Sequence, residues 1–215
     1  MSVEQRRPGR PRASDLSIPT AERILRVAAS SFLQLGYDGV SLESVAKECQ
    51  VTKATVYYYF SSKAHLFTSA MLQMMEDARI ATKRILEMPL PLYDRLRKVA
   101  IGHLRISAPM DFEAVLQRGM ADLTEEQRRA MQAAEHRLQE TLAAAFAEAT
   151  ARGEARPIDP ALAARSFTAA LLKGKTDEER LGQVPFQVEK RAEEILALFW
   201  FGFGGSDERV TPSGP

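Results

Sequence analysis

The sequence predicts an all-α protein, and three observations support this class. Apolar residues recur at intervals of three and four along most of the 215-residue chain. No segment alternates apolar and polar residues over the length of a strand, and capping residues precede several of the periodic stretches. A chain of this length buries enough apolar surface to fold without a disulfide or a structural metal ion.

Residues 20–60 are expected to form three short helices. The first begins at Thr20, the expected N-cap, ends at Gly36, and has an apolar side made of Leu25, Ala28, Phe32 and Leu35. Ser41 caps a second helix, whose buried side is Leu42, Val45, Ala46 and Cys49. After a break at residues 50–52, a third helix is expected over Lys53–Phe60.

The rest of the chain is expected to form longer helices. The first of them opens at residues 61–63 and runs to about Glu87, where two prolines end it. The next covers about residues 92–106, and a short helix capped by Asp111 follows.

Two further helices have clear start signals. Thr124 and Gln127 form a capping box for a helix of about seven turns that ends at Gly153. Asp159 caps another, with Pro160 at its first position, and the last helix runs roughly over residues 187–203. The expected organisation is a flexible basic arm (1–19), a first domain (20–67), a larger second domain (68–203) and a disordered tail (204–215).

The composition argues against several classes of protein. The longest nearly unbroken apolar run, residues 195–205, is 11 residues long, whereas a membrane-spanning helix needs about 20. Without an apolar stretch after the N-terminal arginines, we expect a cytoplasmic protein that is neither exported nor bound to a membrane. One cysteine and three scattered histidines predict no disulfide and no metal site.

Charge is distributed unevenly along the chain. The formal net charge is +1, but residues 1–67 carry nine Lys and Arg against six Asp and Glu. The excess lies in the arm, because residues 13–67 carry five of each sign. The +1 total therefore averages a basic arm over an acidic second domain.

Residues 41–67 are the most informative segment for function. Consecutive helix positions are 100° apart, so Tyr57, Tyr58 and Tyr59 cannot all face one small core, and at least one ring must point outward. Hydrogen-bond donors lie beside them, namely Thr52, Lys53, Thr55 and Lys63. Two short helices separated by a tight turn, with donors and aromatic rings on the second, are typical of a helix-turn-helix that enters the major groove of DNA.

The segment resembles the TetR/AcrR family of one-component transcriptional regulators. The resemblance covers residues 20–70 and rests on Phe32 and Gly36, on Gly39-Val40-Ser41, on Val45-Ala46-Lys47, on the stretch VTKATVYYYF at residues 51–60, and on Lys63 with Leu66-Phe67. It implies a homodimer bound to a double-stranded DNA operator. It places Thr52, Lys53, Ala54 and Thr55 near bases, and Tyr57, Tyr58, Lys63, Ser41, Tyr59 and Thr20 at phosphates.

Three positions in this segment carry open questions. The family usually has glycine where Gln50 stands, and a left-handed conformation there would cost about 1–2 kcal/mol. Glu43 would either be repelled by phosphate or accept a hydrogen bond from a cytosine amine, and Cys49 is either a small buried residue or a redox sensor. In the arm, Arg10 lies in a Gly-Arg-Pro core that Arg12 follows, and this segment either binds an A·T-rich minor groove or is a solvated basic tail. In the first case, deletion of residues 1–12 should flatten the salt dependence of DNA binding by about 0.9 in log–log slope per lost phosphate contact.

The second domain is expected to bind an effector. Seven of the eight methionines lie between residues 71 and 131, which suits either an ordinary core or a cavity for apolar ligands of varied shape. Since the family's second domain usually binds a small molecule, we expect an unknown, partly apolar effector. The expected pocket comprises Met71, Met74, Met75, His103, Met110, Leu116, Met120, Phe146 and Phe167, and other candidate polar anchors are Arg105, Gln117, Arg118 and His136.

The last helices carry more apolar surface than one domain needs. Aromatic residues at 199–201 and 203 cover more than one helical face. The resemblance implies a four-helix bundle between two copies, and the expected interface is Leu162, Phe167, Leu171, Ile195, Phe199 and Trp200. Two-fold symmetry would then require a palindromic operator.

Three functional classes remain. The first is a ligand-released repressor; the second is an effector-independent architectural or division-control factor of the same fold. The third is an enzyme, which is disfavoured because the sequence has no phosphate-binding loop, zinc spacing or nucleophile elbow. We therefore expect no catalytic residue and no cofactor.

Overall fold

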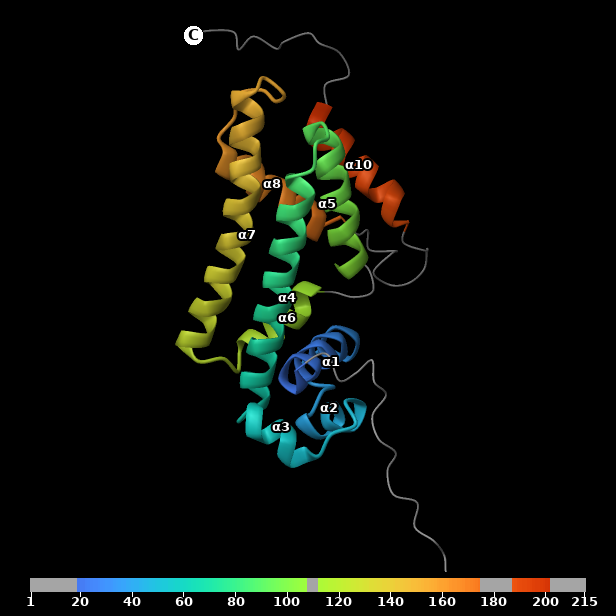
Figure 1. The fold of residues 1–215 in the computed structure, drawn as a ribbon, viewed down its shortest axis with the longest axis vertical. Helices are drawn as coiled ribbons and strands as arrows, with labels where there is room; N and C mark the ends of the chain where they lie inside the picture. The colour runs from blue at the N-terminus through green and yellow to red at the C-terminus, as the bar shows by residue number, and fades with distance from the viewer. Residues whose placement is uncertain (1–18, 108–111, 175–186, 202–215) are drawn as a thin grey trace, which may run out of the picture. The chain divides into compact units, whose positions relative to one another are not determined.

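The computed structural model describes residues 19–107, 112–174 and 187–201, and within these ranges the regular structure is helical (Figure 1). The chain divides into two compact units, residues 1–70 and 71–215. Residues 1–18 of the arm expected at 1–19, the expected cap Asp111 and the tail expected at 204–215 lie outside the described residues.

The first unit contains three short helices and the start of a long one. They are α1 (Thr20–Leu35), α2 (Leu42–Glu48), α3 (Lys53–Tyr59) and α4 (Lys63–Leu86). Three rings form the centre of its core: Phe67 lies 5.0 Å edge-to-face from both Phe32 and Tyr37, and these two stack at 5.8 Å. Their mutual packing ties α1 and the following turn to the start of α4.

The expected apolar side of α1 is wrong at both ends. Ala28 and Phe32 are buried as expected, but Ile24 is buried in place of Leu25, which is half-buried, and Leu35 is 62% exposed. The buried row advances in steps of four, and Leu35 falls off it in the last turn before the chain bends at Gly36. Thr20 is not the N-cap either, because it is the first helical residue and Pro19 precedes it without a side-chain cap.

The turns of the first unit follow their capping residues. Ser41 and Ser44 form a reciprocal capping box at the start of α2, with both bonds at 3.0 Å. Gly36 ends α1 with a positive φ of +73°, which favours glycine, but its ψ of 169° is extended rather than left-handed helical. A Cβ on Gly39 would lie 2.4 Å from the Leu35 carbonyl oxygen, so the close approach of this turn to α1 requires glycine.

The turn between α2 and α3 contains the left-handed residue anticipated from the sequence. Gln50 has φ +55°. Its N–H bonds the Lys47 carbonyl at 3.1 Å, and the Val51 N–H bonds the Ala46 carbonyl at 3.0 Å. This is a Schellman motif, in which glycine normally occupies the position of Gln50.

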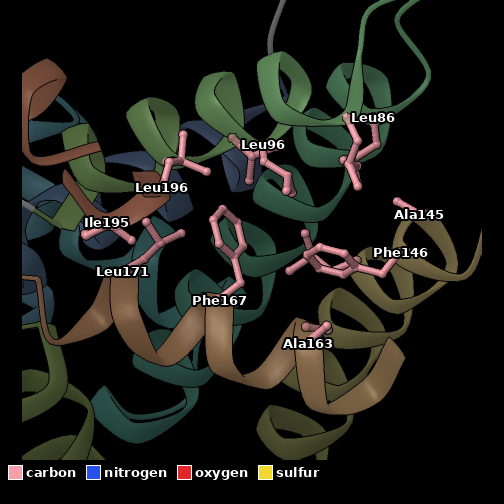
Figure 2. Packing of buried hydrophobic residues seen from close by; sticks show 14 of the residues in the cluster. Leu86, Leu96, Ala145, Phe146, Ala163, Phe167, Leu171, Ile195 and Leu196 are labelled. Carbon is pink, nitrogen blue, oxygen red and sulfur yellow. The ribbon is translucent and has the colours of Figure 1, made fainter. Parts of the chain in front are cut away.

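The second unit is a helical bundle around one apolar core. It contains the rest of α4 with α5 (Leu92–Ser107), α6 (Phe112–Met120), α7 (Glu125–Ala151), α8 (Pro160–Leu172) and α10 (Val188–Phe201). Helix α8 packs against α7, α5 and α10, and α10 also packs against α5. Figure 2 shows the Phe167 ring rising from α8 between Leu171 and Phe146, with Leu96 facing it across the core.

The start signals of α7 and α8 are confirmed. Thr124 and Gln127 bond each other's backbone N–H at 2.9 and 3.2 Å. Asp159 accepts from the backbone N–H groups of Ala161 and Leu162, and Pro160 is the first residue of α8. These local signals fixed the helix starts because each satisfies N–H groups that the helix itself leaves unpaired.

The described residues also bear on membrane-spanning helices and on metal sites. Among the described helices, none is both long and apolar enough to cross a bilayer. In the same part of the chain, no three His, Cys, Asp or Glu side chains come together as potential metal ligands.

Candidate nucleic-acid interface

Helix α3 turns nearly all of its side chains to solvent. Val56 is its buried residue, and α3 packs on α2 through it. Tyr57, Tyr58 and Tyr59 are 43%, 83% and 39% exposed. The expectation that at least one ring points outward is confirmed, and all three rings are accessible.

The exposed rings form a small cluster of their own. The rings of Tyr58 and Tyr59 meet edge-to-face at 5.1 Å. Tyr57 points toward α2, where its hydroxyl donates to Oε1 of Glu43 at 3.4 Å. The helix therefore presents aromatic rings and hydroxyl groups to water. Exposed rings add little to folding stability, but such a surface is suitable for binding a polar polymer.

The start of α3 is held by a side-chain cap. Thr52 Oγ1 accepts from the Thr55 N–H at 3.1 Å and lies 2.8 Å from the Thr55 hydroxyl. A hydroxyl has one proton and two lone pairs, so Thr52 keeps hydrogen-bonding capacity for another partner. Ala54, which lies in the same turn and is also expected near bases, is exposed.

Lys53 is already paired in the free protein. Its ammonium forms an ion pair with Glu43 of α2 and lies 5.4 Å from the centre of the Tyr57 ring. The hydrogen bond from Lys53 lowers the pKa of the Glu43 carboxyl, and the same bond raises the pKa of Lys53. Both groups are therefore charged at neutral pH, and the pairing persists until the pH falls through the lowered pKa of Glu43.

The expected phosphate contacts outside α3 lie at helix starts. Lys63, the first residue of α4, donates to the Asp38 carbonyl at 3.3 Å and covers the Tyr37 ring at 4.5 Å. Ser41 is exposed beside its capping box, and Thr20 is half-buried at the start of α1. Arg10 and Arg12 lie outside the described residues.

Cys49 is buried at the end of α2. Burial raises the pKa of its thiol to about 11. A protonated, inaccessible thiol is a poor redox sensor, which favours the interpretation of Cys49 as a small core residue.

The residues expected to form an effector pocket have diverse surroundings. Met71, Phe146 and Phe167 are buried in the core, and the half-buried ones are Met74, Met75, His103, Leu116 and Met120. Burial lowers the pKa of His103. Met110 lies outside the described residues.

The other candidate polar anchors are on the surface. Arg105 pairs with Glu189 at 2.7 Å, and His136 lies 3.3 Å from Glu140 one turn along α7. Gln117 and Arg118 are exposed on α6.

The second unit contains a cavity of about 750 Å³ in another place. It lies where α4 connects to α5, beside the end of α7 and Trp200 of α10. It contains none of the residues expected in the pocket, and it is lined by Leu86, Glu87, Met88, Pro89, Leu90, Pro91, Leu92, Tyr93, Arg95, Glu148, Arg152, Glu154 and Trp200. Its charged floor is already paired, since buried Arg95 bonds the Leu86 carbonyl at 2.8 Å and Glu154 at 3.1 Å.

The expected dimer interface needs correction. Phe167, Leu171 and Ile195 are buried in the core of their own unit, so they offer little or no surface to a second copy. Phe199 and Trp200 are half-buried against the same core. The exposed apolar side chains on α8 and α10 are Leu162, Leu172, Leu198 and Phe201.

The fold and the exposed α3 define a helix-turn-helix DNA-binding protein of the transcriptional-regulator class. Residues 24–70 match the family described as bacterial regulatory proteins, tetR family, and residues 89–173 match the tetracyclin repressor-like C-terminal domain. The chain belongs to the TetR/AcrR family and is a DNA-binding transcriptional regulator.

Individual relatives support this assignment. The HTH-type transcriptional regulator YhgD of Bacillus subtilis is 28% identical over 89 residues, which are 41% of this chain and 47% of YhgD. The chain thus spans about half the length of this relative.

Two solved structures share the fold. The regulator FadR of Bacillus subtilis, in complex with stearoyl-CoA, superposes with a TM-score of 0.71 at 18% identity, over 85% of this chain and 99% of FadR. AibR, in complex with isovaleryl coenzyme A and operator DNA, superposes with a TM-score of 0.58 at 22% identity, over 85% of this chain and 98% of AibR.

Proposed function

We propose that this protein is a homodimeric repressor that binds a palindromic operator and leaves it when a small-molecule effector binds. The observation that carries the proposal is the surface of α3. Three adjacent tyrosines and Lys53 are exposed on a seven-residue helix that follows a tight turn. No packing requirement of the described first unit accounts for that exposure, whereas DNA contact does.

The expected DNA contacts follow from the position of each side chain. Lys53 and Ala54 are in the first turn of α3, which reaches base edges in a helix-turn-helix; there, lysine suits guanine acceptors and alanine the thymine methyl group. The tyrosine hydroxyls, Lys63 and Ser41 are placed to bond phosphates, which fixes the register without reading sequence.

Dimerisation would use the exposed apolar side chains of the last helices. Helices α8 and α10 pack on each other. Both also carry apolar side chains that their own unit leaves in water, and Phe201 is 71% exposed. A two-fold dimer built on these helices would require operator half-sites about 34–36 Å apart, one helical turn of DNA.

The effector would bind in the second unit. A cavity of 750 Å³ falls within the usual range for small-molecule sites, and the half-buried methionines of α4 are the other candidate position. Because FadR and AibR are described with acyl-CoA thioesters, acyl-CoAs are the first class of compound to test. A hundredfold loss of operator affinity would need about 2.7 kcal/mol of coupling between the two sites.

Helix α4 is the proposed path of that coupling. It is one uninterrupted helix from Lys63, which three residues separate from the end of α3, to Leu86 on the cavity wall. Effector binding would tilt α4 and alter the spacing of the two recognition helices in the dimer. Structures with and without effector that showed the same spacing would remove this mechanism.

The decisive experiment is operator selection from random DNA, followed by a ligand-release screen on the selected site. The proposal predicts a palindromic site and at least one partly apolar compound that lowers affinity for it. Binding at many unrelated sites, with no thermal shift from any compound, would instead indicate the effector-independent DNA-binding factor.

A further inference from the structure

One carboxylate lies against the residues of α3 that are proposed to contact DNA. Glu43, in the first turn of α2, pairs with Lys53 and accepts a hydrogen bond from the hydroxyl of Tyr57. Both donors reach the same oxygen, Oε1, from a neighbouring helix. Two of the donors proposed to bind DNA are therefore occupied by an anion of the protein itself.

This arrangement has a direct consequence for DNA binding. The Lys53 and Glu43 side chains are 60% and 48% exposed, so water already solvates the pair and it adds little to folding stability. The effect of this ion pair on DNA binding is larger. The Glu43 carboxylate is repelled by a nearby phosphate, and Lys53 must leave Glu43 before it contacts DNA.

We infer that Glu43 is a specificity-determining residue, which acts as a competitor for Lys53 and Tyr57 and disfavours DNA other than the operator. At the operator, base contacts from α3 compensate for breaking the Glu43 bonds; on other DNA, only phosphate contacts are available and they do not. The inference rests on the proposed role of α3 in DNA binding.

The charge balance of the segment after the arm makes one carboxylate important. Residues 13–67 contain equal numbers of acidic and basic residues. Without a strong positive field from the rest of this segment, the state of Lys53 is a large part of the attraction between the recognition surface and phosphate.

The test compares two duplexes of equal length, the selected operator and a scrambled sequence, with full-length wild-type protein and Glu43→Gln. Glutamine keeps the size of the side chain and removes its charge. We expect the variant to bind the scrambled duplex about threefold to tenfold more tightly, with a log–log salt slope steeper by about 0.9 for one additional phosphate contact. Operator affinity should rise less, so the ratio of the two affinities should fall.

Two further variants separate a local effect from a change in total charge. Glu135→Gln removes one exposed negative charge from α7 and should leave the ratio unchanged. In a Lys53→Met background, Glu43→Gln should have a smaller effect on the scrambled duplex, because the ammonium that it frees is absent.

Other results would overturn the inference. A loss of operator affinity with unchanged binding to the scrambled duplex would show that Glu43 reads a cytosine amine. Unchanged affinity for both duplexes, with wild type still preferring the operator, would reduce Glu43 to an ordinary surface ion pair and leave the proposed function standing. Wild-type protein without any preference for the selected DNA would overturn the proposed function and this inference together.

Discussion

Each unit contains three consecutive aromatic residues on one helix, and the two runs have opposite fates. In the first unit, Tyr57, Tyr58 and Tyr59 are all exposed. In the second, the Phe199 ring lies 5.5 Å from Phe167 and 5.7 Å from Phe146. Trp200 meets Tyr93 edge-to-face at 5.5 Å, and Phe201 alone is exposed.

The difference follows from the neighbours of each helix. Three successive residues cover about 200° of a helix surface, so one neighbour cannot bury them all. Helix α3 packs on α2, and its buried residue, Val56, lies before the run, whereas α10 packs on both α5 and α8. The exposed tyrosines therefore contribute little to folding and remain accessible for the proposed DNA contact, whereas the first two residues of the run on α10 contribute to folding.

The largest expected effect concerns stability. Phe199→Ala should lower the free energy of unfolding by about 2–4 kcal/mol, because it removes a ring packed against the core. Tyr58→Ala should change it by no more than about 0.5 kcal/mol. Chemical denaturation at a fixed protein concentration measures both, and comparable losses would break the distinction between the two runs.

The next effect concerns the exposed end of the second run. Phe201→Ala should weaken the proposed dimer by about 2 kcal/mol, a roughly thirtyfold rise in its dissociation constant, because large apolar rings dominate such contacts. Analytical ultracentrifugation over a dilution series measures it. Phe199→Leu, which alters the core side of the same helix, is the control, and a dimer unaffected by Phe201→Ala would place the interface elsewhere.

A smaller effect is expected on DNA binding. Tyr58→Ala should reduce operator affinity about tenfold, or about 1.4 kcal/mol, through loss of a phosphate bond and ring contact. Tyr58→Phe isolates the hydroxyl and should account for only part of this loss. Fluorescence anisotropy with a labelled operator measures the affinity. Full affinity in Tyr58→Ala would contradict the proposal that the exposed tyrosines of α3 contact DNA.

The smallest expected effect concerns the stability of two turns, one in each unit. The same Schellman motif closes α2 with Gln50 and α7 with Gly153, whose φ angles are +55° and +73°. Gln50→Gly should stabilise the protein by about 1 kcal/mol by removing left-handed strain, and Gly153→Ala should destabilise it by a similar amount. Thermal denaturation measures both changes. If Gln50→Gly did not stabilise the protein while Gly153→Ala destabilised it, Gln50 would be unstrained.

Local signals in the sequence predicted much of the fold. The capping boxes at Ser41 and Thr124, the Asp159 cap and the left-handed turn at Gln50 depend on residues near in sequence, so their chemistry can be recognised without tertiary contacts. The exposure of at least one tyrosine on α3 was predictable for a similar reason, because helix geometry alone forbids their joint burial. The exposure of all three was not, because it depends on the neighbours of α3.

Features that depend on neighbouring helices could not be predicted in this way. The apolar pattern of α8 and α10 marks Phe167, Leu171 and Ile195 as contacts, but only the packing of α8 against α5, α7 and α10 shows that they face inward. The pairing of Glu43 with Lys53 likewise depends on how α2 crosses α3. The cavity lies at the connection between α4 and α5, which has no apolar periodicity that could predict its position.

The central claim is that the exposed tyrosines of α3 contact operator DNA, and fluorine NMR tests it most directly. The chain has five tyrosines, so 3-fluorotyrosine labelling yields five signals that single Tyr→Phe substitutions can assign. We predict that operator DNA shifts the signals of Tyr57, Tyr58 and Tyr59 much more than those of buried Tyr37 and of Tyr93 in the second unit. Unchanged signals from all three α3 tyrosines in the presence of bound operator would contradict the account.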